Sequence, residues 1–145
     1  MPSAAADPAR LVLDAGPLIA LLHAGDPDHA SARRGFGELT QARARLITPL
    51  PIVFEVYKWV LYEAGAARAR VALTRMTESL DVAYPTPADL DDVADVLAAM
   101  PSWAGSLEDA LVAVVGLRLG TPVWTLNFRD LAAFGSLRFW APSTG

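Results

Sequence analysis

The chain has 145 residues, of which 53% are hydrophobic and 19% charged, and this composition predicts one globular domain and excludes a disordered chain. With no cysteine and only two histidines, disulfide scaffolds, thiolate metal sites and cysteine nucleophiles are excluded. Any bound metal must then take oxygen ligands, as Mg²⁺ and Mn²⁺ do. The net charge of −4 excludes a basic surface over the whole molecule, so a polyanion would have to be bound locally.

Short apolar runs alternate with helical patterns along the chain. Residues 1–9 are predicted to be a flexible leader and residues 10–141 one domain. Short apolar runs predict strands at 10–13, 46–47, 80–84, 122–126 and 137–140. Capping residues and helical periodicity predict helices from Pro17 to 22, around 30–38, at 51–63 and 66–79, from 87, from Ser106 to 119, and a short turn from Asn127. The alternation predicts an α/β fold, a single three-layer α/β/α domain with a mostly parallel central sheet.

Polar residues follow the predicted strands at the positions where such a sheet binds ligands, beyond the carboxyl ends of the strands. Asp14 follows the first strand, Asn127 follows the strand at 122–126, and Asp109 lies in the first turn of the helix from Ser106. Glu55 lies in an apolar stretch, where an unpaired charge is costly. Carboxylates that converge repel one another, and together they stay ionised only around a cation.

Each of these residues also has an explanation that needs no site. Asp14 could cap the following helix, and Ser106 with Asp109 has the form of a capping box. Asn127 and Asp130 have the same spacing, and Glu55 could pair with Lys58 one turn along its helix. Capping does not explain why the residues should converge, so we favour a site where a divalent ion activates water.

The chain resembles PIN-domain proteins, and among them the VapC-type toxin ribonucleases of type II toxin–antitoxin systems. The motifs that carry the resemblance occur in family order over about residues 10 to 140, at Leu13–Leu21, Asp26–His29, Phe54–Glu55, Leu107–Ala113 and Gly120–Leu131. The resemblance implies a PIN-like nuclease domain over residues 10–141. It also implies a ribonuclease that depends on Mg²⁺ or Mn²⁺, with Asp14, Glu55 and Asp109 as acidic metal ligands and catalytic positions.

The chain departs from the family pattern at the fourth acidic position, which falls on Asn127. Asparagine lacks the charge but keeps an acceptor oxygen that can bind one metal or orient water, so Asn127 stays a catalytic candidate. We expect Asp130 to compensate for the missing charge. Thr125 matches the hydroxyl position that steadies the first aspartate in the family. Arg129 is expected to bind phosphate, whereas Glu108 is expected to be solvated.

The resemblance further implies three kinds of partner: an RNA substrate, a cognate antitoxin, and a second copy of the chain in a homodimer or toxin–antitoxin hetero-oligomer. Because no apolar run reaches the roughly 20 residues that a bilayer requires, and no signal peptide is recognisable, we expect a cytoplasmic protein without a membrane partner. The alternative function is a catalytically weakened PIN-fold interaction module that acts by binding protein or RNA, with Asn127 as the mark of lost catalysis. A phosphotransferase with Asp14 as nucleophile is disfavoured, since Gly16 stands where a second acid is needed.

Overall fold

A computed structural model describes residues 7–145 and contains a four-stranded parallel sheet. The strands lie in the order β3-β2-β1-β4, so β1 occupies the interior of the sheet between β2 and β4. Strand β1 is buried over its last three residues, as expected for a strand covered on both faces. The strands are β1 (Arg10–Leu13), β2 (Arg45–Pro49), β3 (Asp81–Ala83) and β4 (Val123–Trp124).

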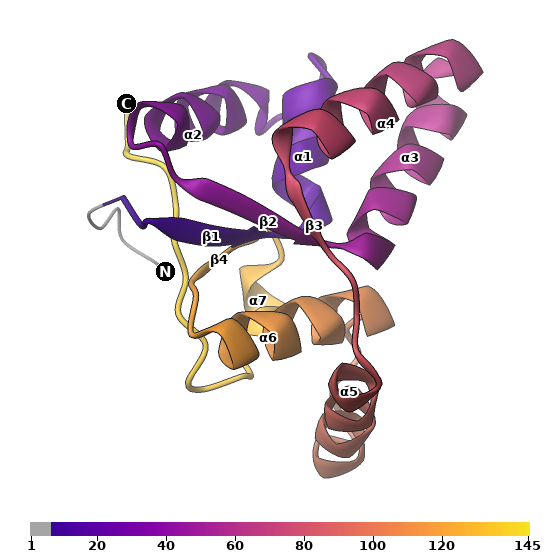
Figure 1. Ribbon diagram of the computed structural model, residues 1–145, viewed down its shortest axis with the longest axis vertical. Coiled ribbons are helices and arrows are strands. Elements are labelled where there is room, and N and C mark those ends of the chain that lie inside the picture. Colours follow the sequence, from indigo (N-terminus) through magenta and orange to yellow (C-terminus); the bar gives the residue numbers. More distant parts are fainter. Residues whose placement is uncertain (1–6) are drawn as a thin grey trace.

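Helices cover both faces of this sheet. Figure 1 shows α1 to α4 on one side and α5 to α7 on the other, which gives three layers. The predicted α/β/α architecture is therefore confirmed. The helices are α1 (Ala15–Leu22), α2 (His29–Gln41), α3 (Leu50–Ala64), α4 (Ala66–Ser79), α5 (Pro87–Ala99), α6 (Leu107–Leu119) and α7 (Phe128–Leu131).

Helix α6 shows how the local sequence determines where a helix is buried and where it ends. Its middle, from Ala110 to Gly116, is buried on every side, which fits the absence of a polar face there. Gly120 ends the helix with φ 59°, a left-handed conformation that glycine adopts without the strain of a side chain. The helix packs against the sheet and α5, and it points its amino end toward the carboxyl edge of the strands.

The predicted elements differ from the structure mainly at their ends. Helix α1 begins at Ala15 instead of Pro17, because Asp14 caps it. Strand β4 covers only two of the five residues predicted. The chain leaves the sheet at Thr125, whose hydroxyl donates to Asp14 and accepts from the Asn127 N–H. The predicted strand at 137–140 was wrong: only an isolated bridge joins Phe139 to Val123. Residues 1–6 of the predicted leader lie outside the described part, and residues 7–9 belong to no helix or strand.

Two of the four tryptophans lie in the core. Trp124 and Trp140 are buried, and their rings meet edge-on with centroids 5.0 Å apart. Helix α2 comes so close to this pair that a Cβ on Gly35 would lie 2.5 Å from a ring carbon of Trp124. Among the described residues, the large exposed aromatic side chains are instead Phe54, Tyr62 and Tyr84, so these two tryptophans offer no surface to a partner. Within residues 7–145, no helix combines the length and the apolar character that a bilayer crossing requires.

Candidate active site

Asp14 lies at the carboxyl end of β1 and is almost completely buried, with 4% of its surface exposed. Its carboxylate accepts two hydrogen bonds, from the Ala15 N–H at 2.8 Å and from the Thr125 hydroxyl at 2.7 Å. The first bond caps α1, so the capping role is confirmed. The second bond comes from the residue that follows β4, the strand next to β1, and capping does not account for it. Asp14 is therefore both a cap and a carboxylate held in a fixed orientation.

Asp109 lies in the first turn of α6, where it forms a capping box with Ser106. The Asp109 N–H donates to the Ser106 hydroxyl at 3.1 Å, and the Ser106 N–H donates to Asp109 Oδ2 at 3.3 Å. These bonds fix the carboxylate at the amino end of the helix, where the helix dipole favours negative charge. Glu108 precedes it in the same turn and is half-buried.

Asn127 connects the carboxylates that lie beyond β4. Its side-chain amide donates to Asp109 Oδ2 at 3.0 Å and to Asp130 Oδ2 at 2.9 Å. The reciprocal capping box that the spacing to Asp130 suggested does not form, because Asn127 makes no capping bond to α7. Its backbone N–H donates to the Thr125 hydroxyl at 2.9 Å. One chain of hydrogen bonds thus runs from Asp14 through Thr125 and Asn127 to Asp109 and Asp130.

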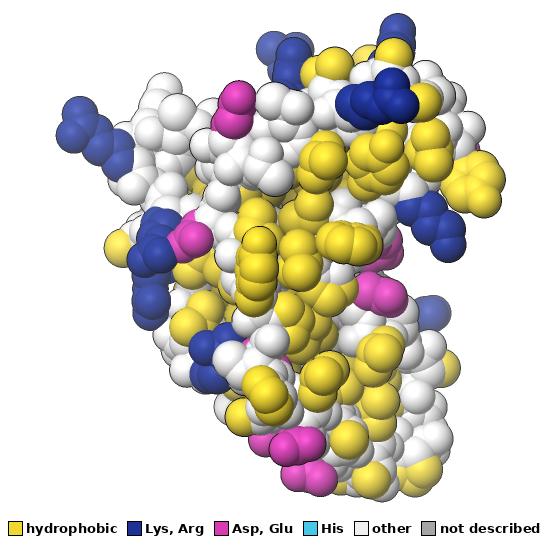
Figure 2. All heavy atoms as spheres, turned by 45° about the vertical axis from the view of Figure 1, so that its right-hand side comes forward, with side chains coloured by type: hydrophobic (Ala, Val, Ile, Leu, Met, Phe, Trp, Pro, Cys, Tyr) yellow, Lys and Arg dark blue, Asp and Glu magenta, His cyan; other side chains and the backbone are white. Residues whose placement is uncertain are grey.

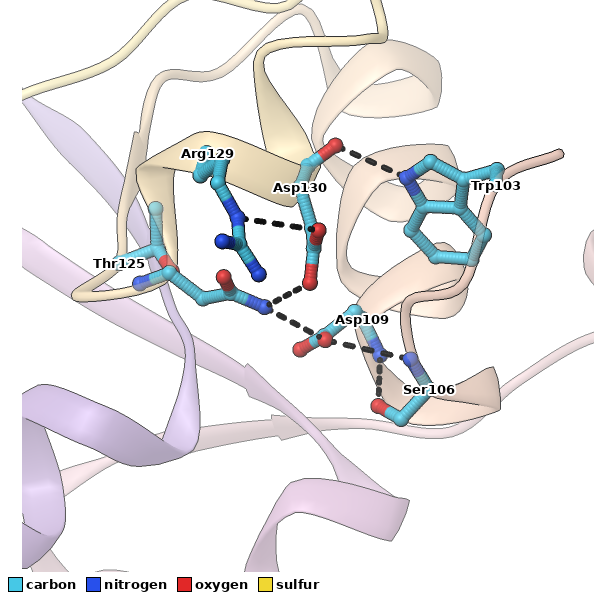
Figure 3. A network of polar contacts seen from close by, with 7 residues as sticks. Trp103, Ser106, Asp109, Thr125, Arg129 and Asp130 are labelled. Atoms are coloured by element: carbon cyan, nitrogen blue, oxygen red, sulfur yellow. Dashed lines mark hydrogen bonds and ion pairs between the residues drawn. The ribbon is translucent and has the colours of Figure 1, made fainter.

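Trp103 holds α7 in place from outside this chain of bonds. Its indole N–H donates to the Asp130 carbonyl at 2.9 Å (Figure 3). Its ring meets Phe134 edge-on, with centroids 5.5 Å apart. A loop residue carries no periodic signal, so its polar contact could not be inferred.

Glu55 lies on α3, on the opposite wall from α6. Although its side chain is exposed at the surface, partial burial and the negative charges of Asp14, Glu108 and Asp109 raise its pKa to about 7. The alternative of an ion pair between Glu55 and Lys58 is wrong, since the structure forms none between these two described residues. Glu55 therefore faces other acids instead of a base.

The same charges act on Asp14. Burial raises the pKa of Asp14 above its ordinary value, the bonds from Thr125 and Ala15 lower it, and the charges of Asp109 and Glu108 raise it further. We call Asp14, Glu55, Glu108 and Asp109 the acidic site, since each member takes part in these mutual effects. Figure 2 shows a hollow in one side of the molecule with acidic side chains on both of its walls.

The acidic site offers the oxygen ligands that a hard divalent ion prefers. All its ligands are carboxylate oxygens, and their uncompensated repulsion is what a bound cation would relieve. Within residues 7–145 no three acidic or histidine side chains stand close enough to enclose an ion by themselves. Magnesium is usually bound through one or two carboxylates and several waters, so the arrangement fits that ion better than a cage of direct ligands.

The remaining predicted residues lie around this site. Asp130 is joined to it through Asn127. Arg129 lies beside Asp130, with its Nε 4.0 Å from Oδ1, and its side chain is 93% exposed (Figure 3). Glu108 was expected to be solvated, but it lies close enough to affect both Asp14 and Glu55. A separate hollow of about 810 Å³ lies between α1, α2 and α4, and no member of the acidic site lines it.

No protein-family model and no curated protein matches this sequence. The structure, in contrast, is similar to VapC20 from Mycobacterium tuberculosis, a sarcin-ricin loop cleaving toxin, with a TM-score of 0.77 and 19% identity over 91% of this chain and 99% of that one. It is similar to VapBC-1 from nontypeable Haemophilus influenzae, with a TM-score of 0.71 and 19% identity over 91% and 97% of the two chains. A toxin–antitoxin complex from Klebsiella pneumoniae has a TM-score of 0.56 and 18% identity, covering 84% of this chain and 90% of that one. The chain therefore has the fold of these toxins, as its resemblance to PIN-domain proteins implied.

Proposed function

We propose that this chain is a toxin ribonuclease of the PIN-domain type that hydrolyses RNA phosphodiesters with Mg²⁺ or Mn²⁺ and is inhibited by an antitoxin. One observation carries the proposal. Three separate segments bring Asp14, Glu55 and Asp109 together, where burial and then the charges of the neighbouring acids raise the pKa of Glu55 to about 7. The site lies at the carboxyl edge of a parallel sheet, the place where such folds bind their ligands.

In the proposed reaction, the side chains of this site position groups and do not attack the phosphate. A bound divalent ion would supply an activated water and stabilise negative charge at the phosphate. Thr125 and the Ala15 N–H orient Asp14. Asp109 accepts its hydrogen bonds on Oδ2, so among the described residues its Oδ1 is without a donor. We expect Arg129 to bind a phosphate oxygen of the substrate, which its 93% exposed side chain next to Asp130 supports.

The proposal is tested by incubating the purified chain with single-stranded RNA and Mg²⁺ or Mn²⁺. We expect cleavage that EDTA stops and that Asp14→Asn and Asp109→Asn each reduce to background, because each removes one charge from the acidic site. Asp92→Asn is the matched control, since it removes the same charge from an exposed position on α5. Cleavage that persists in both site variants would refute the proposal.

The alternative function, a PIN-fold interaction module, is favoured by one observation. The Asn127 amide already bonds both Asp109 and Asp130, which reduces the need for a cation between them. This function predicts RNA or protein binding without cleavage, and no carboxylate-dependent binding of Mn²⁺. Titration of the wild-type chain and Asp14→Asn with Mn²⁺ separates the two functions.

The proposed antitoxin partner is supported by the similarity to a toxin–antitoxin complex. Expression of the chain alone should arrest growth, and co-expression of the open reading frame directly upstream should restore it. Asp14→Asn should not arrest growth. If it does while its fold is retained, the toxicity does not come from the acidic site.

A further inference from the structure

A second hollow of about 460 Å³ adjoins the acidic site along the first turns of α3. Its walls carry two members of the acidic site, Glu55 and Glu108, together with Leu50, Pro51, Phe54 and Lys58. A volume of this size lies within the range of pockets that hold small organic groups. The hollow is therefore continuous with the place where the scissile phosphate is proposed to lie.

Phe54 is the unusual residue in this hollow. It directly precedes Glu55, and 67% of its surface is exposed. A single exposed aromatic side chain is common on protein surfaces and needs no explanation by itself. This one, however, lines a hollow beside four carboxylates, where an apolar ring has no core to join. It offers a flat face to whatever enters the hollow.

Lys58, the only lysine of the chain, lies one turn further along the same helix and lines the same hollow. Among residues 7–145 it forms no ion pair, not even with Glu55 one turn away. An aromatic face and an unpaired ammonium group on one helix are the two elements that bind single-stranded nucleic acid. The ring stacks on a base, and the cation contacts the phosphate.

We propose that Phe54 and Lys58 form a subsite for one nucleotide of the RNA strand, next to the bond that is cut. This inference rests on the proposed ribonuclease function. Phe54 stacks on the base and Lys58 binds the phosphate that follows or precedes it, on the side away from Glu55 and Glu108, whose charges repel phosphate. A base can reach Phe54 only when it is unstacked from its neighbours, so the subsite selects single-stranded RNA over duplex.

The experiment measures binding of a short single-stranded RNA carrying 2-aminopurine to the full chain with Asp14→Asn, which is proposed not to cleave. In this background Phe54→Ala should weaken binding by about 5-fold to about 150-fold, the range that stacking of one base supplies. It should also abolish quenching of the 2-aminopurine fluorescence. Phe54→Leu should behave like Phe54→Ala, because it keeps an apolar side chain without a ring, and Phe54→Trp should retain binding. Tyr62→Ala is the matched control, an 80% exposed aromatic of the same helix that does not line the hollow.

Lys58→Ala should reduce the slope of log affinity against log salt concentration by about 0.7, the contribution of one phosphate contact on a single strand. If Phe54→Ala binds and quenches like its parent while the chain with Asp14 intact cleaves RNA, the subsite is wrong and the ribonuclease function stands. If base quenching depends on Phe54 but no chain cleaves RNA, the ribonuclease function is wrong, and Phe54 binds a nucleotide of an RNA that is not cut. If no variant binds RNA, both are wrong, including the case in which Phe54 serves a protein partner.

Discussion

Replacing Asp14 with asparagine should change the stability of the protein in opposite directions with and without a divalent metal. Burial and neighbouring acids raise the pKa of Asp14, so its ionised form is less favourable in the folded chain than in the unfolded one. Without metal, Asp14→Asn removes that penalty and should raise the melting temperature at pH 7.5. With metal, the wild-type chain should gain binding energy that the variant lacks.

The size of the metal effect follows from linkage. A ligand that binds only the folded state at 100 times its dissociation constant stabilises it by about 2.7 kcal/mol. A chain of 145 residues has an unfolding entropy of about 0.3 kcal/mol per degree at its midpoint. Saturating Mn²⁺ should therefore raise the melting temperature of the wild-type chain by about 9 °C, and that of Asp14→Asn by much less.

The assay is thermal unfolding followed by circular dichroism, with the chain first treated with EDTA and then titrated with Mn²⁺. Asp92→Asn, which removes an exposed acid on α5, should respond to Mn²⁺ as the wild-type chain does. Equal responses of wild type and Asp14→Asn would refute the reasoning, because stabilisation would then come from a site that does not need Asp14. A wild-type chain that does not respond at all would refute the metal site itself.

Three further outcomes can be measured on the metal-free chain. The pKa of Glu55 is about 7 in the folded chain and 4.5 in the unfolded one, so the folded state binds more protons between these pH values. The free energy of unfolding should therefore fall as pH rises from about 4.5 to about 7. Glu55→Gln should flatten that fall in urea titrations. Thr125→Val leaves an oxygen of buried Asp14 without its donor and should cost about 1 to 3 kcal/mol, whereas Thr125→Ser, which keeps the hydroxyl, should cost less. Gly35→Ala places a Cβ against the indole ring of Trp124 and should destabilise the protein by about 1 to 3 kcal/mol in the same titrations. Gly37→Ala, whose Cβ would have nothing within 4 Å, should be neutral or stabilising. Equal effects of the two variants would refute a steric requirement for glycine at position 35.

Much of the fold could be predicted, because the residues that begin, fill and end each helix or strand lie within one short stretch of sequence. Helix α4 occupies the predicted residues 66–79, since Gly65 and the following strand bound it on both sides. The strand predicted at 137–140 failed for the opposite reason. Its apolar residues serve the core through Leu137 and Trp140, and burial of side chains does not require a paired backbone.

The candidate site was predictable only in part. Asp14 and Asp109 stand at a strand end and a helix start, places where chain order alone puts a side chain at the edge of the sheet. Glu108 and Asp109 are neighbours on α6, so their side chains leave the helix about 100° apart. Only the packing of α3 against this end of the site determines that both acids face Glu55, and no local sequence pattern reports that packing. The bridging bonds of Asn127 depend on how α7 packs under Trp103, which is a tertiary contact.

Strand β1 pairs with β2 and also with β4, whose residues lie more than a hundred positions further along the chain. The hydroxyl that holds Asp14 belongs to residue 125 and joins it across the same distance. During synthesis, the first four-fifths of the polypeptide can therefore leave the ribosome without an ordered acidic centre, because the last strand and the threonine after it are still missing. A product truncated before residue 123 would lack β4 and Thr125, and with them the bond that fixes Asp14.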